Sequence, residues 1–317
     1  MFISSNFAFS QNLKKKLLNT MSGEKYGYVD ANDKVIIKPQ FDEAYEFRDG
    51  YAPVKKNEKF GMIDSSGNEV IAFKYKDLGY LQEGLIIATS NGIKFGFINI
   101  KSEIVIPFIY DNCYNFLNNF AIVKIKGKYG MINKKNIMVV PCKYVSMENM
   151  EGGIAKVCAK SDGVNDIGVV NYDNYWGFVN DKGVEITKMN CGKSSTFNLG
   201  NGFAVARTSW ANGDGYDYLI DKNGKIKIPQ SKELTLYKTN NNKYLKVSKR
   251  INGWEKFGFV NYEGKELFPV NFDKIYDFKW VTDDKYLAEA IVNQQTSFYI
   301  NEEFKCVEFN NKKCPEY

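Results

Sequence analysis

The chain has 317 residues and a formal net charge of +6, from 43 Lys and Arg against 37 Asp and Glu. It contains no histidine, which excludes His general bases, Ser-His or Cys-His nucleophile systems and His metal ligands. Aromatic residues make up 15% of the sequence, so we expect strands to dominate. The positive charge is spread along the chain without a dense block, which does not favour nucleic-acid binding.

Residues 1–23 differ in pattern from the rest of the chain. Ala8 and Ser10 occupy the −3 and −1 places of a secretory cleavage pattern, although the basic start and most of the apolar core are missing. We therefore expect a remnant of a signal peptide, with Met1 an internal methionine of a longer product. The alternative is a cytoplasmic N-terminus that is disordered or strand-like. Residues 12–20 have the only claim to helix, and no apolar run reaches the 18 residues that a membrane span needs.

A short motif recurs from residue 24 onward: an aromatic residue, glycine, an apolar residue, Ile or Val, and Asp or Asn. Worn copies occur at 217–221 and 298–301, and successive copies lie 34 to 47 residues apart. Such a period indicates stacked or circularly arranged units that cannot bury their apolar faces alone. The complete copies contain the pairs Tyr26-Gly27, Phe60-Gly61, Phe95-Gly96, Tyr129-Gly130, Trp176-Gly177 and Phe257-Gly258.

Each unit is predicted to form three short strands. The motif is the first, and its last residue opens a hairpin turn, because Asx side chains bond the backbone ahead and a later glycine accepts positive φ, as in Asp64 to Gly67. A second strand comes next, as at 35–39, and we expect its proline to end it. An aromatic connection, as at 41–47, leads to a third strand, as at 51–54.

These units resemble the WG-repeat family, also called KWG repeats. The resemblance lies in the aromatic-Gly motif, the Gly-Lys/Asn-x-Val-Ile-x-Pro segment, the Tyr/Phe-Asp pair and the Gly-Leu/Tyr-Ala-x-Val strand, and it covers about residues 24–304. Only Trp176 keeps the tryptophan that names the family. The resemblance implies an all-β repeat protein of bacteria, commonly exported, that acts as an interaction scaffold without an established general activity.

We predict an N-terminal segment at 1–23, a β-repeat array at 24–304 with seven full units and a partial eighth, and a tail at 305–317. The array is expected to form a propeller-like ring or an open β-superhelix, without cofactor or metal. The motif aromatics are assigned to packing between units, and the glycines to close approach of a neighbouring backbone. In the tail, Cys306 and Cys314 could pair in an oxidising compartment.

The second half departs from the regular repeat through longer hairpins, and it holds all the tryptophans. In two successive units a third strand ends at an arginine soon followed by tryptophan: Arg207 with Trp210, and Arg250 with Trp254. Insertions in repeat arrays gather on one face, and Arg and Trp are enriched at interface hot spots. These four residues are therefore a predicted contact ridge for a protein or glycan partner. The alternative is that both tryptophans fold back over neighbouring units.

Candidate catalytic groups are few. The recurrent acids lie at turn positions, where backbone capping explains them: Asp30, Asp42, Asp64, Asp111, Asp221 and Asp273. The loop at 162–166 is rich in oxygen ligands but lacks the EF-hand spacing for calcium. We predict a non-catalytic scaffold that binds a protein or glycan partner outside the cytoplasm, with a cytoplasmic location as the alternative. The alternative function is a carbohydrate-active enzyme with an acid and base pair at one mouth of the ring.

Overall fold

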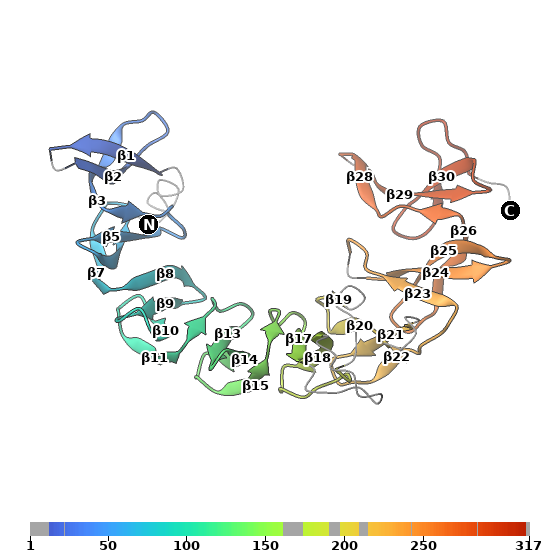
Figure 1. Ribbon diagram of the computed structural model, residues 1–317. Coiled ribbons are helices and arrows are strands. Elements are labelled where there is room, and N and C mark those ends of the chain that lie inside the picture. The colour runs from blue at the N-terminus through green and yellow to red at the C-terminus, as the bar shows by residue number, and fades with distance from the viewer. Residues whose placement is uncertain are drawn as a thin grey trace, which may run out of the picture. The chain divides into compact units, whose positions relative to one another are not determined.

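The computed structural model describes residues 13–21, 23–160, 174–189, 197–208, 215–241, 243–283 and 285–314. Within these ranges the chain forms only strands, turns and irregular segments, and Figure 1 shows the strands grouped in small sheets. The all-β prediction is confirmed. No helix capable of crossing a membrane occurs among these residues. The chain divides into two compact units, Met1–Asn149 and Met150–Tyr317.

The first unit consists of small antiparallel sheets with the strand orders β1-β2-β3, β4-β5-β6-β7, β11-β10-β9-β8 and β12-β13-β14-β15. Its strands are β1 (Lys14–Thr20), β2 (Gly23–Val29), β3 (Val35–Phe41), β4 (Glu43–Ala44), β5 (Tyr51–Lys56), β6 (Lys59–Asp64), β7 (Glu69–Tyr75), β8 (Asp77–Gln82), β9 (Leu85–Thr89), β10 (Phe95–Ile98), β11 (Ile104–Tyr110), β12 (Asn112–Cys113), β13 (Phe120–Ile125), β14 (Lys128–Asn133), β15 (Met138–Tyr144) and β16 (Ser146–Met147).

The second unit repeats this plan in the sheets β19-β20-β21-β22, β23-β24-β25-β26 and β27-β29-β30-β31, while β28 pairs with β29. Its strands are β17 (Ile154–Lys160), β18 (Asn174–Asn180), β19 (Phe197–Asn198), β20 (Phe203–Arg207), β21 (Asp217–Asp221), β22 (Ile226–Ile228), β23 (Leu234–Tyr237), β24 (Leu245–Ile251), β25 (Trp254–Val260), β26 (Glu266–Phe272), β27 (Lys274–Ile275), β28 (Lys279–Thr282), β29 (Lys285–Val292), β30 (Thr296–Ile300) and β31 (Cys306–Val307).

The sequence motif forms an inner strand of each sheet whose order is given above. In the sheet β4–β7 the motif strand β6 lies between β5 and β7, and the aromatic connection adds the short outer strand β4. The expected helix at 12–20 is wrong, because Lys14–Thr20 is strand β1 and pairs with the first motif strand. This segment therefore supplies the third strand that a preceding unit would otherwise provide.

Every motif strand ends in the same turn, which confirms the turn prediction. In the second copy, Asp64 Oδ1 accepts the N–H groups of Ser66 and Asn68, both at 2.9 Å. The residue three places after the Asx residue takes positive φ, as Gly67 does here, even where another residue type replaces glycine. The same side-chain bonds are made by Asp30, Asp64, Asn99, Asn133, Asn180, Asp221, Asn261 and Asn301.

A bulge lies opposite the motif glycine in the sheets that contain β2, β6, β10, β14 and β25, which we call the regular sheets. Phe97 of β10 pairs with Ile106 of β11, and Phe95 pairs with Tyr110, so β11 has two extra residues between these pairs. Pro107 therefore lies in the bulge, and β11 continues beyond it. The expected strand end at proline is therefore wrong here, because a bulged residue is out of the hydrogen-bond ladder and its missing N–H costs little. A Cβ added to Gly96 would lie 2.4 Å from the carbonyl oxygen of Ile106.

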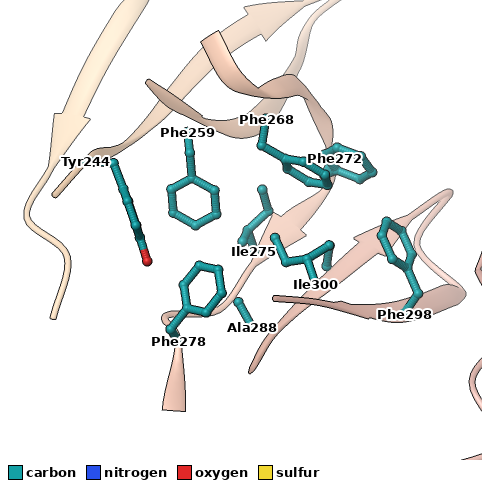
Figure 2. Close-up of a cluster of buried hydrophobic side chains, with 10 residues drawn as sticks. Tyr244, Phe259, Phe268, Phe272, Ile275, Phe278, Ala288, Phe298 and Ile300 are labelled. Atoms are coloured by element: carbon teal, nitrogen blue, oxygen red, sulfur yellow. The ribbon is translucent and has the colours of Figure 1, made fainter. Parts of the chain in front are cut away.

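The core consists of apolar layers between consecutive sheets. Figure 2 shows one of them, where aromatic rings of the sheet β23–β26 face side chains of the sheet that contains β29 and β30. Among the motif aromatics, Phe60 and Trp176 are buried and the others are half-buried. The residue two places later is at most 1% exposed in Tyr28, Met62, Phe97, Met131, Phe178, Leu219 and Phe259.

The tail completes the last sheet. Strand β31 pairs with β30, with Ile300 opposite Cys306. Cys306 forms a disulfide with Cys314, so the pairing that the sequence left open is made. The polar tail is thereby tied to the strand that closes the sheet.

Candidate functional site

The regular sheets share a cross-strand aromatic pair at the end of the sheet where the motif strand begins. We call this end of each sheet its edge. The aromatic residue of the motif lies opposite the aromatic residue that ends the second strand, on the far side of the bulge. Both rings contribute apolar surface where the sheet meets its neighbour. These pairs are Tyr26–Phe41, Phe60–Tyr75, Phe95–Tyr110, Tyr129–Tyr144 and Phe257–Phe272.

The sheet β19–β22 has lost this pair. Asp217 stands at the place of the motif aromatic, because Leu219 pairs with Ile228 as Phe259 pairs with Phe268 in the next sheet. Phe272 lies four residues after Phe268, and Lys232 lies four residues after Ile228. Lys232 therefore stands at the place of the second aromatic residue. Strand β22 ends at Ile228, so no second strand runs beside Asp217.

A cavity of about 420 Å³ lies where the aromatic pair is missing. We call it the Arg207 pocket. The end of β20 and the start of β21 contribute to one part of its lining, and the segment from the end of β22 to β23 contributes to the other. Its lining residues are Arg207, Gly215, Tyr216, Asp217, Ser231, Lys232, Leu234 and Thr235. Leu234 is the only one of these residues with a purely aliphatic side chain, so the described lining consists mainly of polar groups.

The lining of the pocket contains an ion pair. Arg207 and Asp217 are cross-strand partners, with Nε 2.7 Å from Oδ1 and Nη2 3.1 Å from Oδ2. The Asp217 side chain is only 2% exposed, and its Oδ2 also accepts the N–H of Leu236 at 2.9 Å, which ties β21 to β23. The hydrogen bond to Asp217 raises the pKa of Arg207, so the guanidinium stays charged. This bidentate pair uses Nε and Nη2 and leaves the Nη1 donors outside it.

The four residues of the predicted ridge are not all brought together. Arg250 and Trp254 share the hairpin β24–β25, but Arg250 pairs with Glu255 and Trp254 with Ile251, which places them on opposite faces of the hairpin. Trp254 is 64% exposed, so it does not fold back as a lid. Arg207 belongs to the pocket wall of another sheet, and Trp210 lies outside the described residues. The ridge therefore stays a prediction.

The recurrent acids have structural partners. Asp30, Asp64 and Asp221 accept backbone N–H groups in their turns. The other three form ion pairs with the lysine that directly precedes a motif aromatic residue: Lys25 with Asp42, Lys94 with Asp111, and Lys256 with Asp273. Hydrogen bonding to lysine lowers the pKa of each of these three carboxyls, the opposite of what a catalytic acid needs. These six acids thus give no support to a catalytic acid and base pair.

The described residues contain no group of three or more Cys, Asp or Glu side chains arranged to hold a metal ion. The oxygen-rich loop at 162–166 lies outside these residues. Our sequence reasoning also missed Asp217 and Lys232. The signal that could have found them is the alignment of the copies, which puts a charged residue at both places of the aromatic pair in one unit only.

The fold and these sites define an all-β repeat protein whose small sheets share one hairpin plan. The profile of the WG containing repeat matches residues 26–60, 60–92, 95–129, 129–160 and 257–279, and the chain belongs to the WG-repeat family. The matched segments skip residues 161–256, the stretch that holds the Arg207 pocket. The family prediction is confirmed, and the pocket occurs where the chain departs from the family pattern.

The fold also has distant similarities among solved structures. A eukaryotic initiation factor aligns with a TM-score of 0.37 and 8% identity over 94% of this chain and 96% of that chain. Dipeptidyl peptidase 4 of Porphyromonas gingivalis gives 0.38 and 10% over 85% and 53%, and the Pan2 WD40 domain of Neurospora crassa gives 0.29 and 11% over 75% and 82%. At these TM-scores the similarities carry no argument. No curated protein matches the sequence.

Proposed function

We propose that this protein is a non-catalytic β-repeat scaffold that binds its partner through the Arg207 pocket. The observation that supports this is the replacement of an aromatic pair by a polar cavity in one sheet. That sheet keeps the Asx turn at Asp221 and the fully buried Leu219, so its framework is intact. The change includes the places of the aromatic pair, where Asp217 and Lys232 stand instead of rings, and the second strand β22, which is shortened.

The chemistry of the pocket favours binding over reaction. The Asp217 carboxylate is occupied by Arg207 and by a backbone N–H, so it is poorly placed to act as a base. The other lining residues offer hydroxyl and peptide groups and the Lys232 ammonium group. Such groups donate and accept hydrogen bonds at fixed positions, which is what specific recognition requires.

The proposed location is outside the cytoplasm. The Cys306–Cys314 disulfide supports it, because structural disulfides persist in oxidising compartments and are rare in the cytosol. Cys113 is buried, which shields its thiol from oxidation. Fractionation of the native host followed by N-terminal sequencing tests the proposal. A protein found only in the cytoplasmic fraction, with Met1 intact, would contradict it.

The binding proposal is tested with the full chain immobilised and screened against glycan and peptide arrays. We expect saturable binding that K232Q weakens and K265Q leaves unchanged. Lys265 is the matched control because it is an exposed lysine in a turn of the neighbouring sheet, away from the pocket lining. Binding that both variants retain, or no binding at all, would refute a role for the pocket. Conversion of the bound ligand to a product would favour the enzyme alternative.

A further inference from the structure

The charge of the Arg207 pocket selects among ligands. Among the described lining residues two are cations, Arg207 and Lys232, and one is a carboxylate, Asp217, so their net charge is +1. A ligand with a single negative charge balances this site. The Asp217 carboxylate would repel a second negative charge, which disfavours a dianion such as a phosphate monoester.

The two cations have different donors to offer. Arg207 is held by Asp217 through Nε and Nη2, so its Nη1 group is the part that remains for a ligand. Lys232 is exposed and presents an ammonium group at the end of a flexible stem. An ammonium group and a guanidinium N–H in one pocket suit a carboxylate, since charge-assisted hydrogen bonds are about twice as strong as neutral ones.

Hydroxyl groups occupy much of the remaining lining. Ser231, Thr235 and Tyr216 each carry one, and Ser231 Oγ accepts the N–H of Glu233 at 3.2 Å, which directs its own proton elsewhere. A ligand rich in hydroxyls matches such a surface. A peptide partner would instead need an apolar anchor pocket, and Leu234 is the only large aliphatic side chain among the described lining residues.

The size of the cavity sets a further limit. A volume of about 420 Å³ falls in the range of roughly 300–1,000 Å³ that small-molecule sites span. One or two sugar rings fit a site of this class, whereas a folded protein surface does not enter it.

We infer that the Arg207 pocket binds a sugar acid, a saccharide unit that carries one carboxylate. Lys232 and the Nη1 group of Arg207 contact the carboxylate, and Ser231 and Thr235 bond the ring hydroxyls. This inference rests on the proposed function, because it names the ligand class of the same pocket.

The test is isothermal titration calorimetry of the full chain with glucuronic and galacturonic acid. Glucose and galactose are the neutral matched probes, and acetate and inorganic phosphate are the anions without a sugar ring. We expect one of the two sugar acids to bind at least about tenfold more tightly than its neutral counterpart and than either simple anion, since a hydrogen bond to a charged group has this effect or more. Affinity should fall as salt is added.

Two variants separate binding from folding. K232Q should weaken sugar-acid binding by about tenfold or more without a change in unfolding temperature, because Lys232 is exposed and lies outside the Arg207–Asp217 pair. K265Q should bind like the unmodified chain. If K232Q binds the sugar acid as well as the unmodified chain does, the carboxylate contact is wrong.

The outcomes also separate this inference from the proposed function. Equal binding of glucose and glucuronic acid, or K232Q-sensitive binding of an array peptide, would overturn the sugar-acid inference and leave the scaffold proposal standing. If no probe and no array member binds in a manner that depends on Lys232, both are overturned.

Discussion

The sheets β4–β7 and β19–β22 follow one plan and differ at one edge. Both close the motif strand with an Asx turn, at Asp64 and at Asp221. In the first sheet Phe60 lies opposite Tyr75, whereas in the second Asp217 faces a cavity. The turn and the inner strand are thus the constant part of the repeat, and the edge beside the bulge is the part that can change while the sheet still forms.

The change at this edge replaces packing by a buried ion pair. A buried aromatic side chain covers about 150–250 Å². Asp217 recovers little of that area, but its carboxylate accepts from Arg207 and from Leu236, so its charge is compensated. A buried pair of this kind is often neutral in net stability, yet removal of one partner is costly. The sheet still forms, with a shorter second strand and a polar cavity.

The largest effect is expected for the constant part. G96V places a side chain where a Cβ alone would already lie 2.4 Å from the Ile106 carbonyl oxygen. Overpacking and the backbone shift that it forces should lower the free energy of unfolding by about 3 kcal/mol or more. Urea unfolding measures it. The control is G79V in β8, where the nearest atom to an added Cβ is 3.5 Å away. Equal stability of both variants would show that the contact is not close.

The next effect concerns the pocket wall. R207L leaves the Asp217 carboxylate buried without its partner, which should cost about 2–3 kcal/mol, less than a fully buried pair because Arg207 is 36% exposed. The double variant R207L/D217L removes the charge as well and should recover much of this loss. Urea unfolding midpoints at constant slope give both values. A single variant as stable as the unmodified chain would mean that water solvates Asp217.

Sequence reasoning could predict the constant part of the repeat. The Asx residue and its later glycine determine the turn locally, and the motif period identifies the inner strands, so these predictions are confirmed. It failed for Lys14–Thr20 and for Pro107, where a distant partner decides the outcome. The first becomes a strand because β2 offers a free edge, and the second stays in its strand because a bulge forms opposite Gly96.

The pocket was beyond this reasoning for a related physical reason. Arg207 was singled out for its neighbour Trp210, but its role depends on the cross-strand contact with Asp217 ten residues later. Register decides that contact, and a hairpin of irregular length hides the register in the sequence. Lys232 gave no local signal at all, since its meaning comes only from the rings at the same place in other sheets.

A third prediction restores the regular edge. The variant R207K/D217F/Y218G/K232F copies the residues of the sheet β4–β7, where Lys55 lies opposite Phe60 and Gly61 follows Phe60. An aromatic pair adds about 0.5–1.5 kcal/mol beyond its burial, so we expect stability equal to the unmodified chain or higher by about 1 kcal/mol. Ligand binding in the pocket should disappear. Thermal unfolding and calorimetry test both effects, and a variant that still binds would place the site elsewhere.

The smallest effect concerns the lysine and aspartate pairs that three of the regular sheets share. Lys256 lies 2.5 Å from Asp273 and lowers the pKa of that carboxyl. A carboxyl with a folded pKa below its unfolded value of about 3.9 adds stability above that value, and loses it as pH falls through the folded pKa.

D273N keeps an acceptor for the Gln294 N–H and removes only the charge. It should cost about 1 kcal/mol at pH 7, because both side chains keep partial contact with solvent. The difference from the unmodified chain should shrink below about pH 4 and vanish in stronger acid. Urea unfolding between pH 3 and 7 measures it, with D49N at an exposed turn as the control. A difference that persists unchanged at pH 3 would show that the charge is not its cause.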